Sequence, residues 1–353
     1  MTDFTDLPDL ASRSLGGSVV HANDEFFAAR DNLVTAAPPT FAPATFGAKG
    51  QVYDGWETRR RREPGEDHAI VRLGAAGLIH GVVVDTAFFT GNYPPQASVE
   101  GCGMAGYPSP AELAGAEWIP IVPRSPLRGD TRNLFPVTDP HRSTHVRLRI
   151  HPDGGVARLR VHGVVVPDPG LFPDGWLDLA ALEYGGLVVA CSDMFYGSPH
   201  QLIAPGLARV MGEGWETARR RDADNDWVEV RLAAAGRIRL VELDTSHFKG
   251  NAPGAAALRG VDERVADPAD PGAWFEVLPR TRLQPDTRHR FPVGDGAETT
   301  ATRVRLEIFP DGGMARLRLP GRLDATALAQ LDRAWRGSLP PGHTRQLGAA
   351  GLP

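Results

Sequence analysis

The sequence predicts an all-β protein that consists of two copies of one antiparallel β-sandwich. Three observations support this fold class. Motifs from the first half of the chain return in the same order in the second half. Apolar and polar residues alternate over short segments, which is typical of strands with one buried face. Helical patterns are few, whereas the 40 glycines and 31 prolines among 353 residues provide material for many turns.

The internal repeat covers most of the chain. The segment DGWETRRRR, which begins at Asp54, returns as EGWETARRR from Glu213. Three further motif pairs keep the same order: DTAFFTGN and DTSHFKGN, RSPLRGDTRNLFPV and RTRLQPDTRHRFPV, HPDGGVARLRVHG and FPDGGMARLRLPG. We therefore predict a first repeat at residues 12–166, a second at 177–325 and a C-terminal helical tail at 326–353, with a Pro/Gly-rich linker between the repeats.

Each repeat is expected to fold into short strands. HAIVRLG and WVEVRLA alternate, and LIHGVVVDTAFF and RIRLVELDTSHF are longer apolar runs. THVRLRIHPDGGVARLRVHG predicts a hairpin of two strands that pair across a PDGG turn. Helices are expected only near Ser109 and in DATALAQLDRAWRG, where Asp324 can cap the first turn. About eight strands per repeat favour a sandwich over a helical fold.

Composition excludes several function classes. A formal net charge of −5 gives no general attraction to nucleic acid or to anionic membranes. The N-terminal segment is acidic, and no apolar run approaches the roughly 20 residues of a membrane span, so we expect a cytoplasmic protein. Two cysteines fit a reducing compartment. The histidines and cysteines form no HxH, HExxH or CxxC spacing, so no cofactor is predicted; a divalent ion held by acidic residues stays open.

The GWET segments place charged residues beside an indole. Trp56 and Trp215 are either core residues or ligand contacts, and Glu57 and Glu216 are either acids with a chemical role or partners of nearby arginines. Alternate side chains of an extended segment point to opposite sides, so the arginines that follow cannot all face one way. One side of each block can present guanidinium groups to a carboxylate, and the candidates are Arg60, Arg61, Arg219 and Arg220.

Polar residues follow the long apolar strand of each repeat. Asp85 and Asp244 close the strand, and Asn92 and Asn251 lie in the Gly-Asn turn that comes next. The rim of a sandwich, where strands end, is a usual place for a binding site. The alternative is that these side chains only accept hydrogen bonds from the turn backbone.

The two repeats differ at positions near this rim. His247 and Lys249 replace Phe88 and a threonine of the first repeat, and Glu100 of the first repeat has an arginine counterpart. Such divergence is expected when one copy keeps a chemical role and the other drifts. We therefore add His247 and Glu100 as acid–base candidates and Lys249 as a candidate anion contact.

The motifs DGWETRRRR, DTAFFTGNYPP, GWETARRR, DTSHFKGN and PDTRHRFPV resemble those of the allantoicase family, and the resemblance runs through both repeats. It implies tandem jelly-roll sandwiches of the galactose-binding-like type and assembly into a homo-oligomer. It also implies a hydrolase that acts on a C–N bond of allantoate and releases ureidoglycolate and urea in allantoin (purine) degradation.

Allantoate carries one carboxylate and two ureido groups on a single carbon. Under the resemblance, an arginine binds the carboxylate, and Asp85, Asn92, Asp244 and Asn251 bind the ureido groups. Proton delivery to the departing urea falls to one of Glu57, Glu100, Glu216 and His247. The site is expected at the rim of one repeat or between the two. Two alternatives stay open: a non-catalytic carbohydrate-type binding protein, and a hydrolase of ureidoglycolate.

Overall fold

The computed structural model describes residues 3–294 and 298–349. Contacts divide the chain into two compact units. Unit 1 comprises Met1–Val166 together with Trp335–Pro353, and unit 2 comprises Pro167–Ala334. Each unit contains one repeat and is built almost wholly of antiparallel strands, so the predicted all-β class is confirmed. The repeat limits expected from the sequence stay a prediction beside these units.

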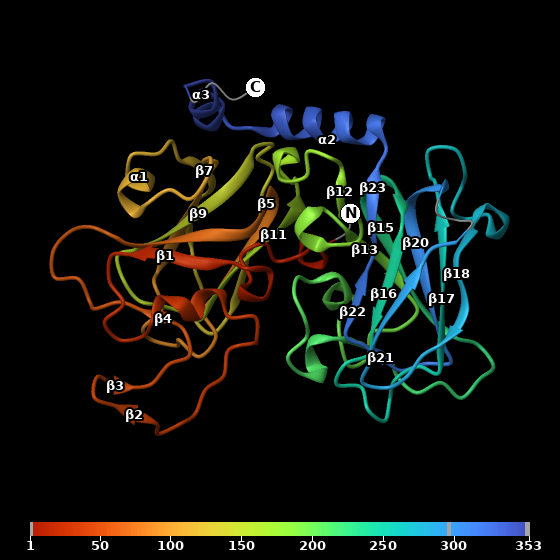
Figure 1. Ribbon diagram of the computed structural model, residues 1–353. Coiled ribbons are helices and arrows are strands. Elements are labelled where there is room, and N and C mark those ends of the chain that lie inside the picture. The colour runs from red at the N-terminus through yellow and green to blue at the C-terminus, as the bar shows by residue number, and fades with distance from the viewer. Residues whose placement is uncertain (1–2, 295–297, 350–353) are drawn as a thin grey trace. The chain divides into compact units, whose positions relative to one another are not determined.

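One 19-residue strand organises unit 1. β5 (Asp67–Asp85) is long enough to take part in both layers of the sandwich (Figure 1). Its first half pairs with β1 and β9, and its second half pairs with β8 and β11. The register shifts between Arg72 and Gly77, where the strand leaves one layer for the other. A side chain at Gly77 would collide with the carbonyl of Val164, so only glycine fits this crossing.

The other strands of unit 1 extend these layers. The layer that contains the first half of β5 continues from β9 through β6 to β7. The bounds of the main strands are β1 (Ser18–Ala22), β6 (Gln96–Cys102), β7 (Ile119–Pro126), β8 (Arg132–Pro136), β9 (Arg142–His151) and β11 (Arg158–Val165). Two small ladders lie outside them, formed by β2 (Phe46–Gly47) with β3 (Gly50–Gln51), and by β4 (Trp56–Glu57) with β10 (Gly155–Val156).

Unit 2 repeats this arrangement with the long strand divided in two. β15 (Asp226–Ile238) pairs with β13, β20 and β23, and β16 (Leu240–Asp244) pairs with β19 and β22. The remaining bounds are β12 (Trp176–Asp178), β13 (Leu187–Cys191), β14 (Trp215–Glu216), β17 (Ala255–Val261), β18 (Phe275–Arg282), β19 (Arg288–Pro292), β20 (Thr300–Phe309), β21 (Gly313–Met314), β22 (Arg316–Arg318) and β23 (Pro320–Leu323).

The predicted hairpin around the PDGG turn is wrong. Its two strands exist as β9 and β11, but they do not pair with each other. β9 bonds to the first half of β5, β11 bonds to the second half, and the Gly155–Val156 segment between them pairs with β4 instead. The long strand β5 supplies the backbone partners of both segments, which the local alternation of apolar and polar residues cannot reveal.

The repeated tryptophans belong to the core. Trp56 and Trp215 are both 0% exposed. Each indole N–H donates to a backbone carbonyl of the preceding loop, that of Asp24 at 2.7 Å and that of Asp193 at 2.8 Å. A buried indole with its one donor satisfied fixes the loop against the sandwich, so these residues have a structural role.

Helices are short and lie where the sequence predicts them. α1 (Pro110–Ala114) begins with a capping box between Ser109 and Glu112. α2 (Ala325–Ser338) follows Asp324, whose carboxylate accepts from the backbone N–H of Ala327 at 2.6 Å. The C-terminal helix α3 (Pro341–Ala349) is tied to unit 1 by Arg345, which pairs with Glu117. Among the described residues, no helix is long and apolar enough to cross a membrane.

Short 3₁₀ turns complete the described chain. They are η1 (Phe4–Asp6), η2 (Arg13–Leu15), η3 (Arg30–Val34), η4 (Pro169–Leu171), η5 (Leu182–Tyr184), η6 (Pro199–Ile203), η7 (Met211–Glu213) and η8 (Pro271–Ala273). η3 is the one that bears on function, since the segment after it forms one wall of the cavity described next.

Candidate functional site

Unit 1 contains a cavity of about 380 Å³ at the end of β5, which we call the Asp85 cavity. Its walls come from the segment after η3, the end of β5 with its following turn, the start of β8, and β11. A volume of this size suits a small ligand. The lining residues are Ala36, Pro38, Pro39, Asp85, Ala87, Phe88, Asp130, Thr131, Arg132 and Arg160.

The turn after β5 is held in one conformation by its own side chains. Asp85 accepts the backbone N–H of Ala87 at 2.9 Å, and Asp130 accepts that of Phe88 at 2.7 Å. The Thr86 hydroxyl is fully buried and donates to the carbonyl of Arg128 at 2.6 Å. Phe88 and Asp130 both have positive φ, 68° and 46°. These contacts fix the two carboxylates at the cavity wall before any ligand arrives.

The cavity brings together two carboxylates and two guanidinium groups. Within the described residues, the Arg132 guanidinium has no hydrogen bond or ion pair, and neither does Oδ2 of Asp85 or of Asp130. Arg160 is partly engaged, by Asp9 and by two backbone carbonyls, all at 3.3 Å. A ligand that has both an anionic group and N–H donors therefore finds free partners of both kinds.

Arg158 supports the wall from behind. Its side chain is 1% exposed and donates to the carbonyls of Ala37 and of the lining residue Pro38, and to the Asp54 carboxylate at 2.9 Å. Burial alone would raise the pKa of Asp54, but the hydrogen bonds from Arg158 and Thr40 outweigh it and lower the pKa. Asp54 is thus a stable anion that anchors Arg158.

The ring of Phe88 lines the cavity, and two further rings are stacked behind it. Phe88 stacks on Phe41, and Phe41 stacks on Tyr53, each with ring centroids 5.6 Å apart. Phe41 and Tyr53 come from a segment that is longer in unit 1. Asp24 and Trp56 lie 32 residues apart, whereas Asp193 and Trp215 of unit 2 lie only 22 apart. The extra residues include the β2–β3 ladder, and the longer segment supplies the rings that stack behind Phe88.

Two predicted pairs of site residues are joined directly. Asn92 donates to Glu57 at 2.7 Å, and Asn251 donates to Glu216 at 2.6 Å, so each repeat carries the same carboxylate–amide pair. Burial raises the pKa of Glu57, and the hydrogen bond from Asn92 offsets only part of that rise. Glu57 and Asn92 are not among the lining residues of the Asp85 cavity.

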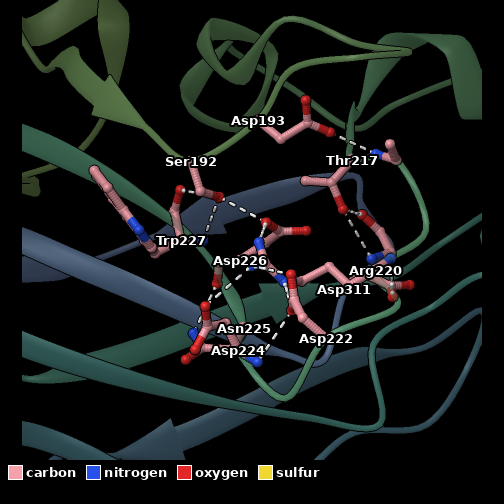
Figure 2. Close-up of polar contacts among 12 residues, drawn as sticks. Ser192, Asp193, Thr217, Arg220, Asp222, Asp224, Asn225, Asp226, Trp227 and Asp311 are labelled. Atoms are coloured by element: carbon pink, nitrogen blue, oxygen red, sulfur yellow. Dashed lines mark hydrogen bonds and ion pairs between the residues drawn. The ribbon is translucent and has the colours of Figure 1, made fainter.

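The arginine blocks alternate as predicted, but their inward side chains are already paired. Arg60 and Arg219 are exposed, whereas Arg61 donates to the buried Asp67 at 2.7 Å. Figure 2 shows the equivalent Arg220 between Asp222 and Asp226, with 2.8 Å to each. The inward arginines are thus paired with the protein's own carboxylates, and binding of a ligand carboxylate by these blocks stays a prediction.

The other predicted residues lie outside the Asp85 cavity. Glu100 accepts from Arg147 at 2.6 Å and from Arg149 at 2.8 Å, so it takes part in an ion-pair network between β6 and β9. His247 has positive φ, 74°, and its Nε2 lies 3.0 Å from the carbonyl of Ala208. Asp244 is buried at the end of β16, and Lys249 is exposed. Of the predicted site residues, the cavity contains Asp85 alone.

Three charged lining residues are not among the predicted site residues: Asp130, Arg132 and Arg160. Their signal was present, because the DTR of GDTRN returns in PDTRH, and ARLR occurs in both repeats. In the sequence, these motifs by themselves indicate only the repeat. Among the described residues, no group of three or more His, Cys, Asp or Glu side chains could hold a metal ion.

A family model described as the allantoicase repeat matches residues 8–166 and again residues 177–324. The chain belongs to the allantoicase family. A "Probable allantoicase" of Nocardia farcinica is 61% identical over 322 residues, which cover 91% of this chain and 95% of that protein. One of Streptomyces coelicolor is 50% identical over 341 residues, with 93% and 89% coverage. The resemblance stated from the motifs is thereby confirmed.

Solved structures of the allantoicase family have the same fold. The crystal structure of allantoicase from Saccharomyces cerevisiae superimposes with a TM-score of 0.75 at 33% identity, and it covers 89% of this chain and 92% of that one. A second allantoicase structure gives a TM-score of 0.76 at the same identity, with 90% and 93% coverage. The predicted pair of tandem jelly-roll sandwiches is thus confirmed.

Proposed function

We infer that this chain hydrolyses allantoate to ureidoglycolate and urea, and that the Asp85 cavity is where allantoate binds. Relatives named allantoicase match nearly the whole chain, which favours hydrolysis over a non-catalytic binding role. One observation supports the site assignment above all. The cavity contains the unpaired guanidinium of Arg132 and two carboxylates, Asp85 and Asp130, each with one oxygen free of hydrogen bonds within the described residues. A substrate with one carboxylate and several N–H groups complements this set.

Substrate orientation follows from the charges. Arg132 binds the substrate carboxylate, with Arg160 beside it in the cavity. The free oxygens of Asp85 and Asp130 accept N–H groups of the two ureido arms. Phe88 covers the cavity with its ring and reduces access of bulk water. The central carbon of allantoate then lies between the arginines that bind its carboxylate and the aspartates that bind its ureido groups.

The reaction needs one proton to move from water to nitrogen. The C–N bond to one ureido arm breaks, its electron pair stays on nitrogen, and the water oxygen forms a new bond to the central carbon. A carboxylate that takes a proton from this water and delivers it to the departing nitrogen balances the reaction. Asp85 and Asp130 are placed for this transfer by the backbone N–H groups that hold their other oxygen. Glu57, whose pKa is raised, is the alternative donor: it would give the nitrogen its proton and regain one from the aspartate that activates the water.

Urea release is the measurement that tests this function. The purified protein is incubated with allantoate, with and without a chelator such as EDTA, and urea is measured over time. We expect urea and ureidoglycolate in equal amounts under both conditions, since we propose no cofactor. Absence of urea in both samples would reject the function. Release only without chelator would reject the metal-free proposal and keep the reaction.

We further propose a homo-oligomer in the cytoplasm, as the sequence analysis expects. Light scattering coupled to size-exclusion chromatography measures the mass in solution, and the single chain has a mass of 38.0 kDa. A mass of one chain at micromolar concentration would contradict the oligomer. Cell fractionation with detection of urea-releasing activity tests the compartment.

A further inference from the structure

The two repeats differ at one pair of facing residues next to the Asp85 cavity. In unit 1, Val83 of β5 faces Leu134 of β8. In unit 2, Glu242 of β16 faces Arg290 of β19 in the same register. An apolar pair in one repeat thus corresponds to an ion pair in the other. Two residues further on, both repeats have the same facing pair, Asp85 with Arg132 and Asp244 with Arg288.

This difference decides whether the arginine of the repeated DTR motif is free. Glu242 accepts from Arg288 at 2.6 and 3.2 Å and from Arg290 at 2.9 Å. Burial favours the neutral form of Glu242, but these bonds outweigh it and lower its pKa, so it is a carboxylate at neutral pH. Val83 can offer no such bond to Arg132. The same arginine position is therefore ion-paired in unit 2, whereas in unit 1, within the described residues, Arg132 has no hydrogen bond or ion pair and interacts with Asp3 only at longer range.

We propose that only unit 1 binds the substrate carboxylate, and that the Val83–Leu134 pair determines this by leaving Arg132 free. The counterpart in unit 2 has become an internal ion pair centred on Glu242. This assignment rests on the proposed function for the identity of the substrate. In unit 2 the arginine of the repeated DTR motif therefore has a structural role, as the partner of Glu242.

The neighbourhood of each arginine supports the same assignment. In unit 1 the left-handed turn after β5 presents Phe88, which lines the cavity and stacks on Phe41. In unit 2 the same turn position is His247, whose ring meets the carbonyl of Ala208 instead. The shorter segment before Trp215 has no residues that correspond to the β2–β3 ladder of unit 1. Both the free guanidinium and the lining ring of Phe88 are thus specific to unit 1.

The test compares equivalent substitutions in the two repeats. Arg132→Gln and its matched counterpart Arg288→Gln are assayed for urea release over a range of allantoate concentrations. We expect Arg132→Gln to lower kcat/KM about 100-fold, mainly through KM, because a carboxylate loses a charged partner. Arg288→Gln is expected to stay within about twofold of the wild type. Circular dichroism confirms that each variant is folded.

A second pair of variants exchanges the facing residues themselves. Val83→Glu with Leu134→Arg reproduces the unit 2 ion pair in unit 1 and keeps Arg132 in place. We expect the same rise in KM as for Arg132→Gln, since the new carboxylate occupies the guanidinium. Glu242→Val with Arg290→Leu makes the reciprocal change in unit 2 and is expected to leave activity unchanged. This pair separates loss of a free guanidinium from loss of the arginine side chain.

The outcomes distinguish this proposal from the proposed function. Suppose that the wild type releases urea and that Arg288→Gln loses activity while Arg132→Gln does not. This result would overturn the assignment to unit 1 and keep the proposed function. A similar partial loss in both variants would also overturn it, since both repeats would then be productive. If the wild type releases no urea, the function fails, and calorimetric titration with allantoate decides the rest. Binding abolished only by Arg132→Gln supports unit 1, and any other result rejects it.

Discussion

Replacement of Arg158 by methionine tests whether a buried guanidinium holds the wall of the Asp85 cavity. Arg158 is 1% exposed and makes five hydrogen bonds, to the carbonyls of Ala37, Pro38, Asp54 and Ala157 and to the Asp54 carboxylate. Methionine fills a similar volume but donates none of them. The change leaves several backbone carbonyls without their donor and removes the charged partner of Asp54, which keeps its hydrogen bonds from Thr40.

The expected loss comes mainly from the backbone carbonyls that lose their buried donor, because the Asp54 side chain is 29% exposed and keeps its hydrogen bonds from Thr40. Leaving such buried acceptors unsatisfied costs about 1–3 kcal/mol. We therefore expect the free energy of unfolding to fall by about this amount. Since two of the lost bonds hold the backbone at Ala37 and Pro38, we also expect kcat/KM for allantoate to fall.

Arg316 of unit 2 provides the matched control. It is 4% exposed and donates to three backbone carbonyls, those of Gly206, Glu213 and Ala315, but to no carboxylate. Arg316→Met should therefore cost less stability than Arg158→Met, and it should leave activity unchanged because the cavity lies in unit 1. Guanidinium chloride unfolding, followed by circular dichroism and fitted with separate transitions for the two units, measures both changes. A loss below about 1 kcal/mol for Arg158→Met, or a larger loss for Arg316→Met, would refute this reasoning.

Three further predictions concern single titratable groups. Glu57→Gln should lower kcat with little change in KM if this carboxyl delivers a proton, and an unchanged kcat would remove it from the mechanism. Burial, with Arg72 nearby, lowers the pKa of His145 to about 4. Because the unfolded chain takes up this proton near pH 6.5, the free energy of unfolding should fall as pH drops from 6.5 to 4, by about 3 kcal/mol in all. Denaturation at pH 7 and pH 4.5 should show a smaller fall for His145→Gln; equal falls would contradict the assignment. Burial raises the pKa of the Cys102 thiol to about 11, so iodoacetamide at pH 8 should label it only after denaturation, as mass spectrometry can show.

Much of the fold could be predicted because it is written in local patterns. The repeated motifs identify two related units, alternation identifies strands such as β9 and β11, and the capped helix after Asp324 is where its sequence places it. The partner of each strand could not be predicted, because a strand's alternation is the same whichever neighbour it bonds. The PDGG segment shows this, since both of its flanking strands pair with β5 rather than with each other.

The candidate site, like the fold, could be predicted only in part from the sequence. Asp85 was identifiable as a polar residue at the end of a buried strand, and it lines the cavity. Arg61 and Arg220 were equally good candidates in sequence, but the structure pairs each with a buried aspartate. Arg132 was overlooked because nothing near it in the sequence shows that it lacks a partner. Whether a charged side chain is free or engaged depends on residues far away in the chain.

Residue order identifies this protein as a duplicated all-β chain of the allantoicase family, because duplication and family motifs can be read along the chain. Which charges meet is set by the fold. It placed Val83 and Glu242 at equivalent positions beside equivalent arginines, and it left one guanidinium free and neutralised the other. Ion pairing acts over a few ångströms in space. Strand pairing sets these distances between residues about 50 positions apart in the chain, so residue order does not reveal them.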